Sequence, residues 1–170
     1  VWGGRGPGVL ASAGSTTFRR DFEGAPRPNT WYPIALANKL AGKDLEPELG
    51  DIRSTVNSSQ NWYLGIDGNT PSGQYDFVST MLHEVGHGLG FIGVYNVENG
   101  VGEGSFYPAI YDTFMENGDG ESIVYGPYEN NSRDLGRQLT SSNLYFNSPL
   151  SMENEELAKL YAPFSFNQDS

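Results

Sequence analysis

The chain has 170 residues, enough for one domain with its own hydrophobic core and too few for two ordinary ones. Its 10 Lys and Arg against 21 Asp and Glu give a net charge of −11, which argues against nucleic-acid binding because phosphate contacts depend on clustered basic side chains. The chain has no cysteine, which excludes disulfides and thiolate ligands, and no run of about 20 apolar residues that would span a membrane.

Residues 1–75 predict short strands around one helix. We expect this helix over 31–41, because Pro33 suits its first turn, apolar residues share one face and Gly42 follows as a stop. Val9 and Leu10 indicate at most a short strand. Alternating, β-branched or aromatic residues predict three further strands, at 16–22, 51–59 and 61–66, and a turn cluster follows at 66–73.

The strongest element is a helix over 76–90, with the sequence DFVSTMLHEVGHGLG. Asp76 is the expected N-cap, since a carboxylate there can accept hydrogen bonds from the first turn. Four apolar residues recur at helical spacing and predict a buried apolar side for this helix: Val78, Leu82, Val85 and Leu89.

The remainder of the chain is rich in loops, in keeping with 22 Gly and 10 Pro overall. It predicts a short helix at 107–115 opened by Pro108, strands at 122–126 and 143–146, and a closing helix at 153–162. Without repeats or an internal linker, these elements predict a single domain of mixed α+β type over 1–170.

Both histidines of the chain, His83 and His87, lie in the helix at 76–90. Residues four apart occupy one face of a helix, so two imidazoles can reach one Zn²⁺ at about 2.0–2.1 Å. Glu84 is rotated by about 100° from His83, where it can act on a zinc-activated water rather than join the ligands. The alternative is an ordinary helix that carries two surface or core histidines.

Three glycines in or just after this helix strengthen the metal interpretation: Gly86, Gly88 and Gly90. Each costs up to about 1 kcal/mol relative to Ala in a helix. Local propensity would not select them, so we expect close approach of another segment or a sharp exit from the helix.

The stretch HEVGHGLG at 83–90 resembles the H-E-x-x-H-x-x-G core of the metzincin clan of zinc peptidases. Upstream, TWYPIALANKLAG, DIRSTVNSS and WYLGIDG are similar to segments of a group of secreted bacterial metallopeptidases, and the resemblance covers roughly 8–115. It implies a zincin-like catalytic domain with a small mixed twisted sheet, an active-site helix and a backing helix. The upper part would be about 1–90 and the loop-rich lower part about 91–170.

The third zinc ligand departs from this pattern, because the place where the clan has His or Asp is Gly93. A catalytic zinc normally has three protein ligands, so a later carboxylate must serve. The candidates are Glu98, Glu103, Asp112, Glu116, Asp119, Glu121, Glu129 and Asp134. We favour Asp112, because an unpaired carboxylate in the apolar stretch YPAIYDTFM would be costly, with Glu116 second and Glu103 third. A helix-surface or capping role is the alternative for Asp112.

The resemblance implies further roles in peptide hydrolysis. Glu84 would be the general base, and Tyr107 or Tyr111 would donate to the oxyanion. Met152 is the best match to the methionine turn beneath the zinc, with a plain core methionine as the alternative. The strand at 51–57 is the natural candidate for the edge strand that binds substrate by strand addition.

From these features we expect a secreted, monomeric zinc endopeptidase acting on protein or peptide substrates. The start at Val1, without initiator Met or signal peptide, indicates a mature or excised piece. Structural Ca²⁺ is possible in two acidic loops, GIDGNTPSG and ENGDGES, although neither has EF-hand spacing and solvated turns are the alternative. Two other hypotheses are a zincin-fold binding or adhesion module without turnover, and a zinc hydrolase of a non-peptide bond.

Overall fold

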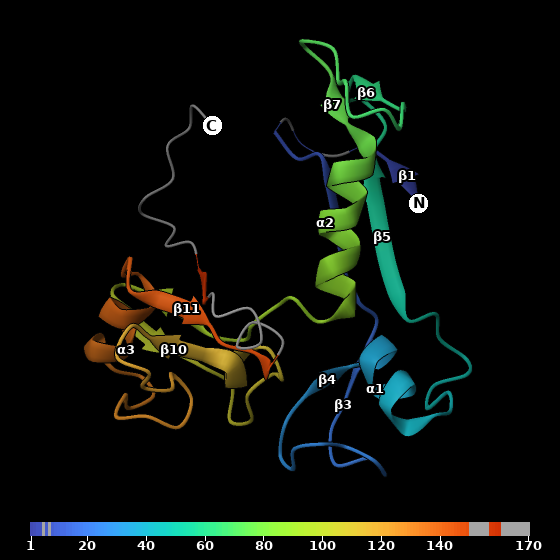
Figure 1. Ribbon diagram of the computed structural model, residues 1–170. Coiled ribbons are helices and arrows are strands. Elements are labelled where there is room, and N and C mark those ends of the chain that lie inside the picture. Colours follow the sequence, from blue (N-terminus) through green and yellow to red (C-terminus); the bar gives the residue numbers. More distant parts are fainter. Residues whose placement is uncertain (5, 7, 150–156, 161–170) are drawn as a thin grey trace. The chain divides into compact units, whose positions relative to one another are not determined.

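The computed structural model describes the whole chain except residues 5, 7, 150–156 and 161–170. Contacts divide the chain into two units, hereafter the first unit (Val1–Pro28 and Tyr32–Phe91) and the second unit (Asn29–Trp31 and Ile92–Ser170). The described residues contain three α-helices and several small sheets, which confirm the predicted mixed α+β class (Figure 1). No helix among the described residues is long and apolar enough to cross a membrane.

A small mixed sheet forms one side of the first unit. Its strands are β1 (Trp2–Gly3), β2 (Ala11–Ser15) and β5 (Ile52–Asn57), in the order β1-β5-β2. The central strand β5 runs parallel to β1 and antiparallel to β2, with Ala11 opposite Val56 and Ser15 opposite Ile52. The strand predicted at 51–59 is therefore present, whereas β2 begins just after the apolar pair at Val9 and Leu10.

Helix α1 (Ile34–Ala41) lies within the helix predicted over 31–41. Pro33 is its N-cap and the last residue of strand β4 (Tyr32–Pro33), which pairs with β3 (Phe18–Arg19). Gly42 ends the helix in the left-handed conformation, with φ of 66°, which glycine adopts without steric cost. Tyr32 and Ile34 are almost fully buried, so this junction belongs to the core of the unit.

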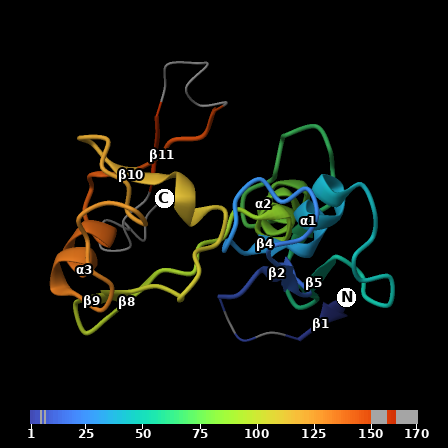
Figure 2. The ribbon, with the colours of Figure 1, turned by 90° about the horizontal axis from the view of Figure 1, so that it is seen from below.

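Helix α2 (Phe77–Leu89) packs against β2 and β5, beside α1 (Figure 2). Asp76 caps it as predicted, because its carboxylate accepts a hydrogen bond of 2.6 Å from the Ser79 N–H. Ahead of it, β6 (Trp62–Tyr63) pairs in parallel with β7 (Tyr75–Asp76).

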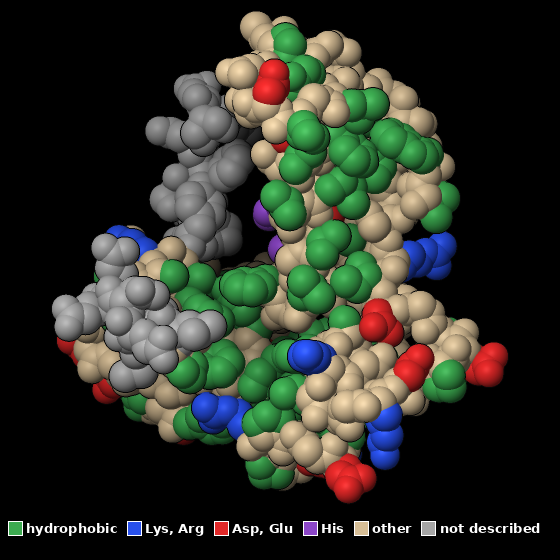
Figure 3. All heavy atoms as spheres, turned by 45° about the vertical axis from the view of Figure 1, so that its right-hand side comes forward, with side chains coloured by type: hydrophobic (Ala, Val, Ile, Leu, Met, Phe, Trp, Pro, Cys, Tyr) green, Lys and Arg blue, Asp and Glu red, His purple; other side chains and the backbone are tan. Residues whose placement is uncertain are grey.

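The buried face of α2 is not the one predicted. Its buried residues are Glu84 and Gly88, whereas Leu82 is 69% exposed. Val78 and Leu89 are exposed as well, and Val85 is half-buried. Most of the apolar stripe predicted to be buried is thus exposed. Hydrophobic side chains also gather at the surface of the molecule in Figure 3.

The second unit is built from a hairpin, a helix and a small antiparallel sheet. The hairpin strands β8 (Asn96–Glu98) and β9 (Val101–Glu103) pack on helix α3 (Arg133–Leu139), which the Ser132 hydroxyl caps. The sheet contains β10 (Met115–Asn117), β11 (Leu144–Phe146) and β12 (Ala158–Lys159). The hydrophobic core of the second unit comprises Met115, Ile123, Leu135 and Leu144. Trp31 joins this unit by pairing with Ala109.

Several sequence predictions for the second unit are wrong. The helix predicted at 107–115 is reduced to the single 3₁₀ turn η1 (Asp112–Phe114), which leads directly into β10. Instead of the strand predicted at 122–126, Ser122 forms an isolated bridge with Glu116 and residues 123–125 form a turn. Helix α3 was not predicted. The strand at 143–146 is present as β11, but part of the helix predicted at 153–162 is strand β12, and its other residues, except for 157 and 160, lie outside the described part of the chain.

Two glycines of α2 provide a matched test of its packing. A Cβ at Gly88 would lie 2.5 Å from Ile52 Cγ2, whereas a Cβ at Gly86 would meet nothing within 4 Å. We expect Gly88→Ala to lower the free energy of unfolding by about 1–2 kcal/mol, because overpacking outweighs the gain in helix propensity. Gly86→Ala should raise it by up to about 1 kcal/mol. Urea denaturation measures both, and equal effects of the two substitutions would contradict this packing.

Candidate functional site

The two histidines converge on one point of the α2 surface. Their Nε2 atoms lie 3.0 Å apart, and their rings are nearly perpendicular, with an interplanar angle of 89°. Two ligand nitrogens at 2.0–2.1 Å from a tetrahedral zinc would be about 3.3 Å apart. His83 and His87 therefore have the separation that two zinc ligands need.

The exit of α2 fixes the orientation of His87. Gly90 has a φ of 122°, and the Phe91 N–H turns back to donate to the Gly86 carbonyl at 3.0 Å. The Phe91 carbonyl then lies 2.8 Å from Nδ1 of His87. Because a carbonyl can only accept, Nδ1 carries the proton and the lone pair stays on Nε2. A backbone carbonyl commonly orients a metal-binding imidazole in this way.

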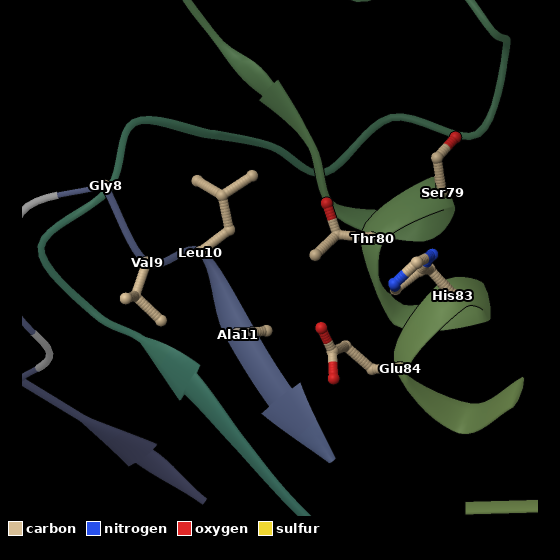
Figure 4. Close-up of a pocket in the computed structure, with 8 residues that line it drawn as sticks. All are labelled: Gly8, Val9, Leu10, Ala11, Ser79, Thr80, His83 and Glu84. Atoms are coloured by element: carbon tan, nitrogen blue, oxygen red, sulfur yellow. The ribbon is translucent and has the colours of Figure 1, made fainter. Parts of the chain in front are cut away.

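Glu84 lies on the buried side of α2, with 8% of its surface exposed. Its carboxylate points towards Ala11 of β2 (Figure 4). A pocket of about 530 Å³ opens beside it, between the chain at 8–11 and the first turns of α2. Among the described residues Glu84 has no ion-pair partner, so its carboxylate is not committed to another side chain.

The glycines around the histidines have different explanations. Gly88 allows α2 to approach Ile52, and Gly90 supplies a left-handed turn beside Pro33, whose Cγ would lie 3.2 Å from an added Cβ. Both agree with the expected close approach and sharp exit. Nothing in the structure explains Gly86.

Asp112 is fully buried in the second unit. The Oδ2 atom of Asp112 accepts a hydrogen bond of 2.8 Å from the Ala109 N–H. The Val94 nitrogen donates to both carboxylate oxygens, at 3.1 Å and 3.2 Å. A Cβ at Gly93 would overlap this carboxylate. Glycine at position 93 and aspartate at position 112 are therefore linked, because the Asp112 side chain fills the space that a side chain at position 93 would need.

Burial raises the pKa of the Asp112 carboxyl from 3.8 to about 6, although the hydrogen bonds from Ala109 and Val94 act in the opposite direction. Desolvation disfavours the charged form, and two backbone N–H groups compensate only part of that cost. Asp112 is thus a buried acid without a cationic partner among the described residues.

The third ligand stays a prediction. His83 and His87 belong to the first unit, whereas Asp112, Glu116 in β10 and Glu103 in β9 belong to the second. Within the described part of the chain, no group of three His, Asp or Glu side chains comes together to hold a metal ion.

The other predicted site residues have the following places. Tyr107 packs edge-on against Trp31, and Tyr111 stacks on Phe146 at 4.9 Å. Burial, followed by the charge of Asp112, raises the pKa of the Tyr111 hydroxyl. A role for either tyrosine at an oxyanion stays a prediction, and Met152 lies outside the described residues.

The predicted edge strand is wrong. Residues 52–57 form β5, which is the central strand because β1 and β2 pair with its two sides. The strand at the edge of this sheet beside Glu84 is β2, which packs against α2. Sequence reasoning missed β2 because ASAGS lacks the alternation of large apolar and polar residues that indicates a strand.

In the two acidic loops, the side-chain oxygens serve the loops themselves. Asp67 accepts hydrogen bonds from the Tyr63 hydroxyl and the Asn69 N–H. Asn117 accepts from the N–H groups of Asp119 and Glu121. The contacts of Asp67 with the Asn69 N–H and of Asn117 with the Asp119 N–H are those of Asx turns, and calcium binding in these loops stays a prediction.

The raised pKa of Asp112 predicts a pH dependence of the metal-free second unit. A buried carboxyl with a raised pKa favours the folded state below about pH 4 and loses this contribution as the pH rises through about 6. The difference amounts to about 3 kcal/mol. In chelator-containing buffer, the free energy of unfolding of the wild type relative to Asp112→Asn should fall between pH 4 and 7. Asp134→Asn, at an exposed acid of α3, is the control, and parallel curves for all three proteins would contradict the assignment.

Comparison with known proteins gives one match. Residues 29–121, more than half of the chain, match the model of the SPBPB7E8-like family, and this segment contains His83, Glu84, His87 and Asp112. No curated protein and no solved structure matches the chain.

Proposed function

The chain belongs to the SPBPB7E8-like family, whose name states no reaction, and from the site itself we propose that it is a zinc-dependent endopeptidase. The observation that carries this proposal is the convergence of His83 and His87, 3.0 Å apart at Nε2, with Glu84 between them in the sequence. Action outside the cell is part of the proposal and rests on the sequence resemblance alone.

The donor set suits zinc. Two imidazoles whose Nε2 atoms converge are typical zinc ligands, and the Phe91 carbonyl holds His87 in the tautomer that a metal requires. When bound, zinc would supply positive charge that acidifies water and polarises the substrate carbonyl.

Glu84 is the proposed general base. It would accept a proton from the attacking water and pass it to the nitrogen that leaves when the peptide C–N bond breaks. Among the described residues Glu84 has no ion-pair partner, so its carboxylate is not engaged by another charged side chain. Its place beside the pocket at residues 8–11 leaves one side accessible to a substrate.

Asp112 is the proposed third ligand. A buried carboxylate without a cationic partner gains stability from a bound cation, and the glycine at position 93 is the residue that makes room for it. The substrate main chain would add to the edge of β2, in place of the strand at 51–57 expected from the sequence.

One observation favours a second candidate, a zincin-fold binding module without turnover: Gly93 stands where the metzincin clan has its third zinc ligand. A zinc hydrolase of a non-peptide bond would use the same groups, and no observation favours it.

The test of the main proposal compares the wild type with Glu84→Gln. Both should bind one zinc, because Glu84 is not a ligand, but only the wild type should hydrolyse casein and a mixed peptide library. Loss of the base should lower kcat by at least about 10²-fold. A chelator should abolish and zinc restore the wild-type activity. Zinc-loaded wild type that cleaves no peptide would favour the binding module.

The third ligand is tested by zinc affinity, measured by competition with a chromophoric chelator. We expect Asp112→Ala to weaken zinc binding more than Glu116→Ala or Glu103→Ala does, by about 10-fold or more. Circular dichroism of the metal-free variants controls for folding. If Glu116→Ala alone weakened zinc binding, the third ligand would be Glu116 of β10 in place of Asp112.

A further inference from the structure

The hairpin of the second unit turns at Asn99 and Gly100. Strands β8 and β9 pair with Glu98 opposite Val101, so these two residues alone form the loop. Both have a positive φ, 52° and 77°, as the type I′ turn of a tight hairpin requires. Asn99 is exposed, and no described residue hydrogen-bonds its carboxamide or the Gly100 N–H. The carboxamide of Asn99 and the backbone nitrogen that follows it are therefore both uncommitted.

A second Asn-Gly pair, Asn117 and Gly118, has different surroundings. Asn117 is 4% exposed, and its Oδ1 accepts hydrogen bonds from the N–H groups of Asp119 and Glu121. Its Nδ2 donates to Oε2 of Glu121 at 2.7 Å and to the Tyr128 hydroxyl at 2.9 Å. These four hydrogen bonds use the full capacity of a carboxamide. The second unit thus holds the same dipeptide once in an exposed turn and once with its side chain fixed.

We propose that Asn99 is a site of spontaneous covalent modification, in which the Gly100 nitrogen attacks the carboxamide carbon of Asn99. The peptide N–H first gives its proton to hydroxide. The nitrogen then bonds to Cγ, and the Cγ–Nδ2 bond breaks as Nδ2 takes a proton from water and leaves as ammonia. Water opens the resulting five-membered imide at one of its two carbonyls, which leaves either aspartate or isoaspartate at position 99.

Three features of the turn favour this reaction. The attack is intramolecular, so the two groups meet at a high effective concentration. Glycine places no Cβ beside the attacking nitrogen and permits the backbone rotation that ring closure needs. The strands on either side have only three residues each, so local opening of the turn breaks few hydrogen bonds. At Asn117, by contrast, the carboxamide must first lose its four partners.

The isoaspartate product would disturb the packing of α3 on the hairpin (Figure 2). A Cβ at Gly136 of α3 would overlap the Gly100 carbonyl oxygen, and a Cβ at Gly102 would lie 2.5 Å from the Gly136 nitrogen. Gly102 also exchanges two backbone hydrogen bonds with Ser132, the cap of α3, at 2.8 Å and 3.2 Å. Isoaspartate adds one carbon to the backbone of a loop that has no spare room against this helix. We therefore expect the isoaspartate form to hold α3 less firmly.

The site is tested by incubating the whole chain at mildly alkaline pH, folded and in urea, and mapping its peptides by mass spectrometry. In the folded protein Asn99 should be converted at least about tenfold faster than Asn117, because loss of even one or two hydrogen bonds at Asn117 has that effect. In urea the two rates should become similar, since both residues precede glycine. Conversion should accelerate as the pH rises, because the attacking nitrogen must lose its proton.

Two outcomes would overturn the modification site. One is equal conversion of Asn99 and Asn117 in the folded protein, and the other is an unmodified Asn99 under conditions that convert it in urea. Asn99→Gln is the matched control, because attack on its longer side chain would need a six-membered ring, and position 99 should then stay unchanged.

The effect on α3 is tested by hydrogen exchange. The α3 amides of the isoaspartate form, enriched by ion-exchange chromatography, should exchange about tenfold faster than those of the unmodified protein. Asn99→Asp carries the same added charge without the extra backbone carbon, so its α3 amides should exchange as in the wild type. Equal exchange in all three forms would overturn the proposed loosening of α3.

Discussion

The close packing of α2 on the sheet is the contact on which the rest of the site depends. Gly88 lies where any side chain would overlap Ile52 of β5, so the helix sits closer to the sheet than a row of larger residues would permit. This approach buries Glu84 beside β2. Around the helix axis, His83 lies about 100–140° from Glu84 and Gly88, and His87 lies about 60–100° from them. Both histidines therefore stay accessible. One helix thus carries a buried carboxylate, an exposed imidazole and a half-buried one within a single turn and a half.

The parts of the first unit that sequence could predict are those specified by local rules. Asp76 as a cap, Gly42 and Gly90 as stops and the spacing of His83 and His87 depend only on neighbours along the chain. The buried face of α2 could not be predicted in the same way. Two sets of residues recur at helical spacing along α2. Periodicity predicted that the more apolar set, with Val78 and Leu82, would be buried, whereas the residues buried in the folded protein are Glu84 and Gly88.

The second unit was less predictable because its interactions are nonlocal. The stretch at 107–115 has helical features, yet Trp31 pairs with Ala109 and Met115 pairs with Phe146, which leaves only one 3₁₀ turn between two extended segments. Helix α3 did carry a local signal, with Ser132 as its cap and Asp134 in its first turn, but its polar, glycine-containing sequence obscured it. The relation of Gly93 to Asp112 spans 19 positions and could be recognised only from the structure.

The contact between Gly88 and Ile52 also has an evolutionary consequence. Both positions lie in the segment shared with the family, and together they occupy a fixed volume between helix and sheet. A gain of one methyl group at position 88 requires a matching loss at position 52. In an alignment of relatives these two columns should therefore co-vary, with Ala at the helix position accompanied by Val or Ala on the strand, and the pair would mark the helix–sheet distance throughout the family.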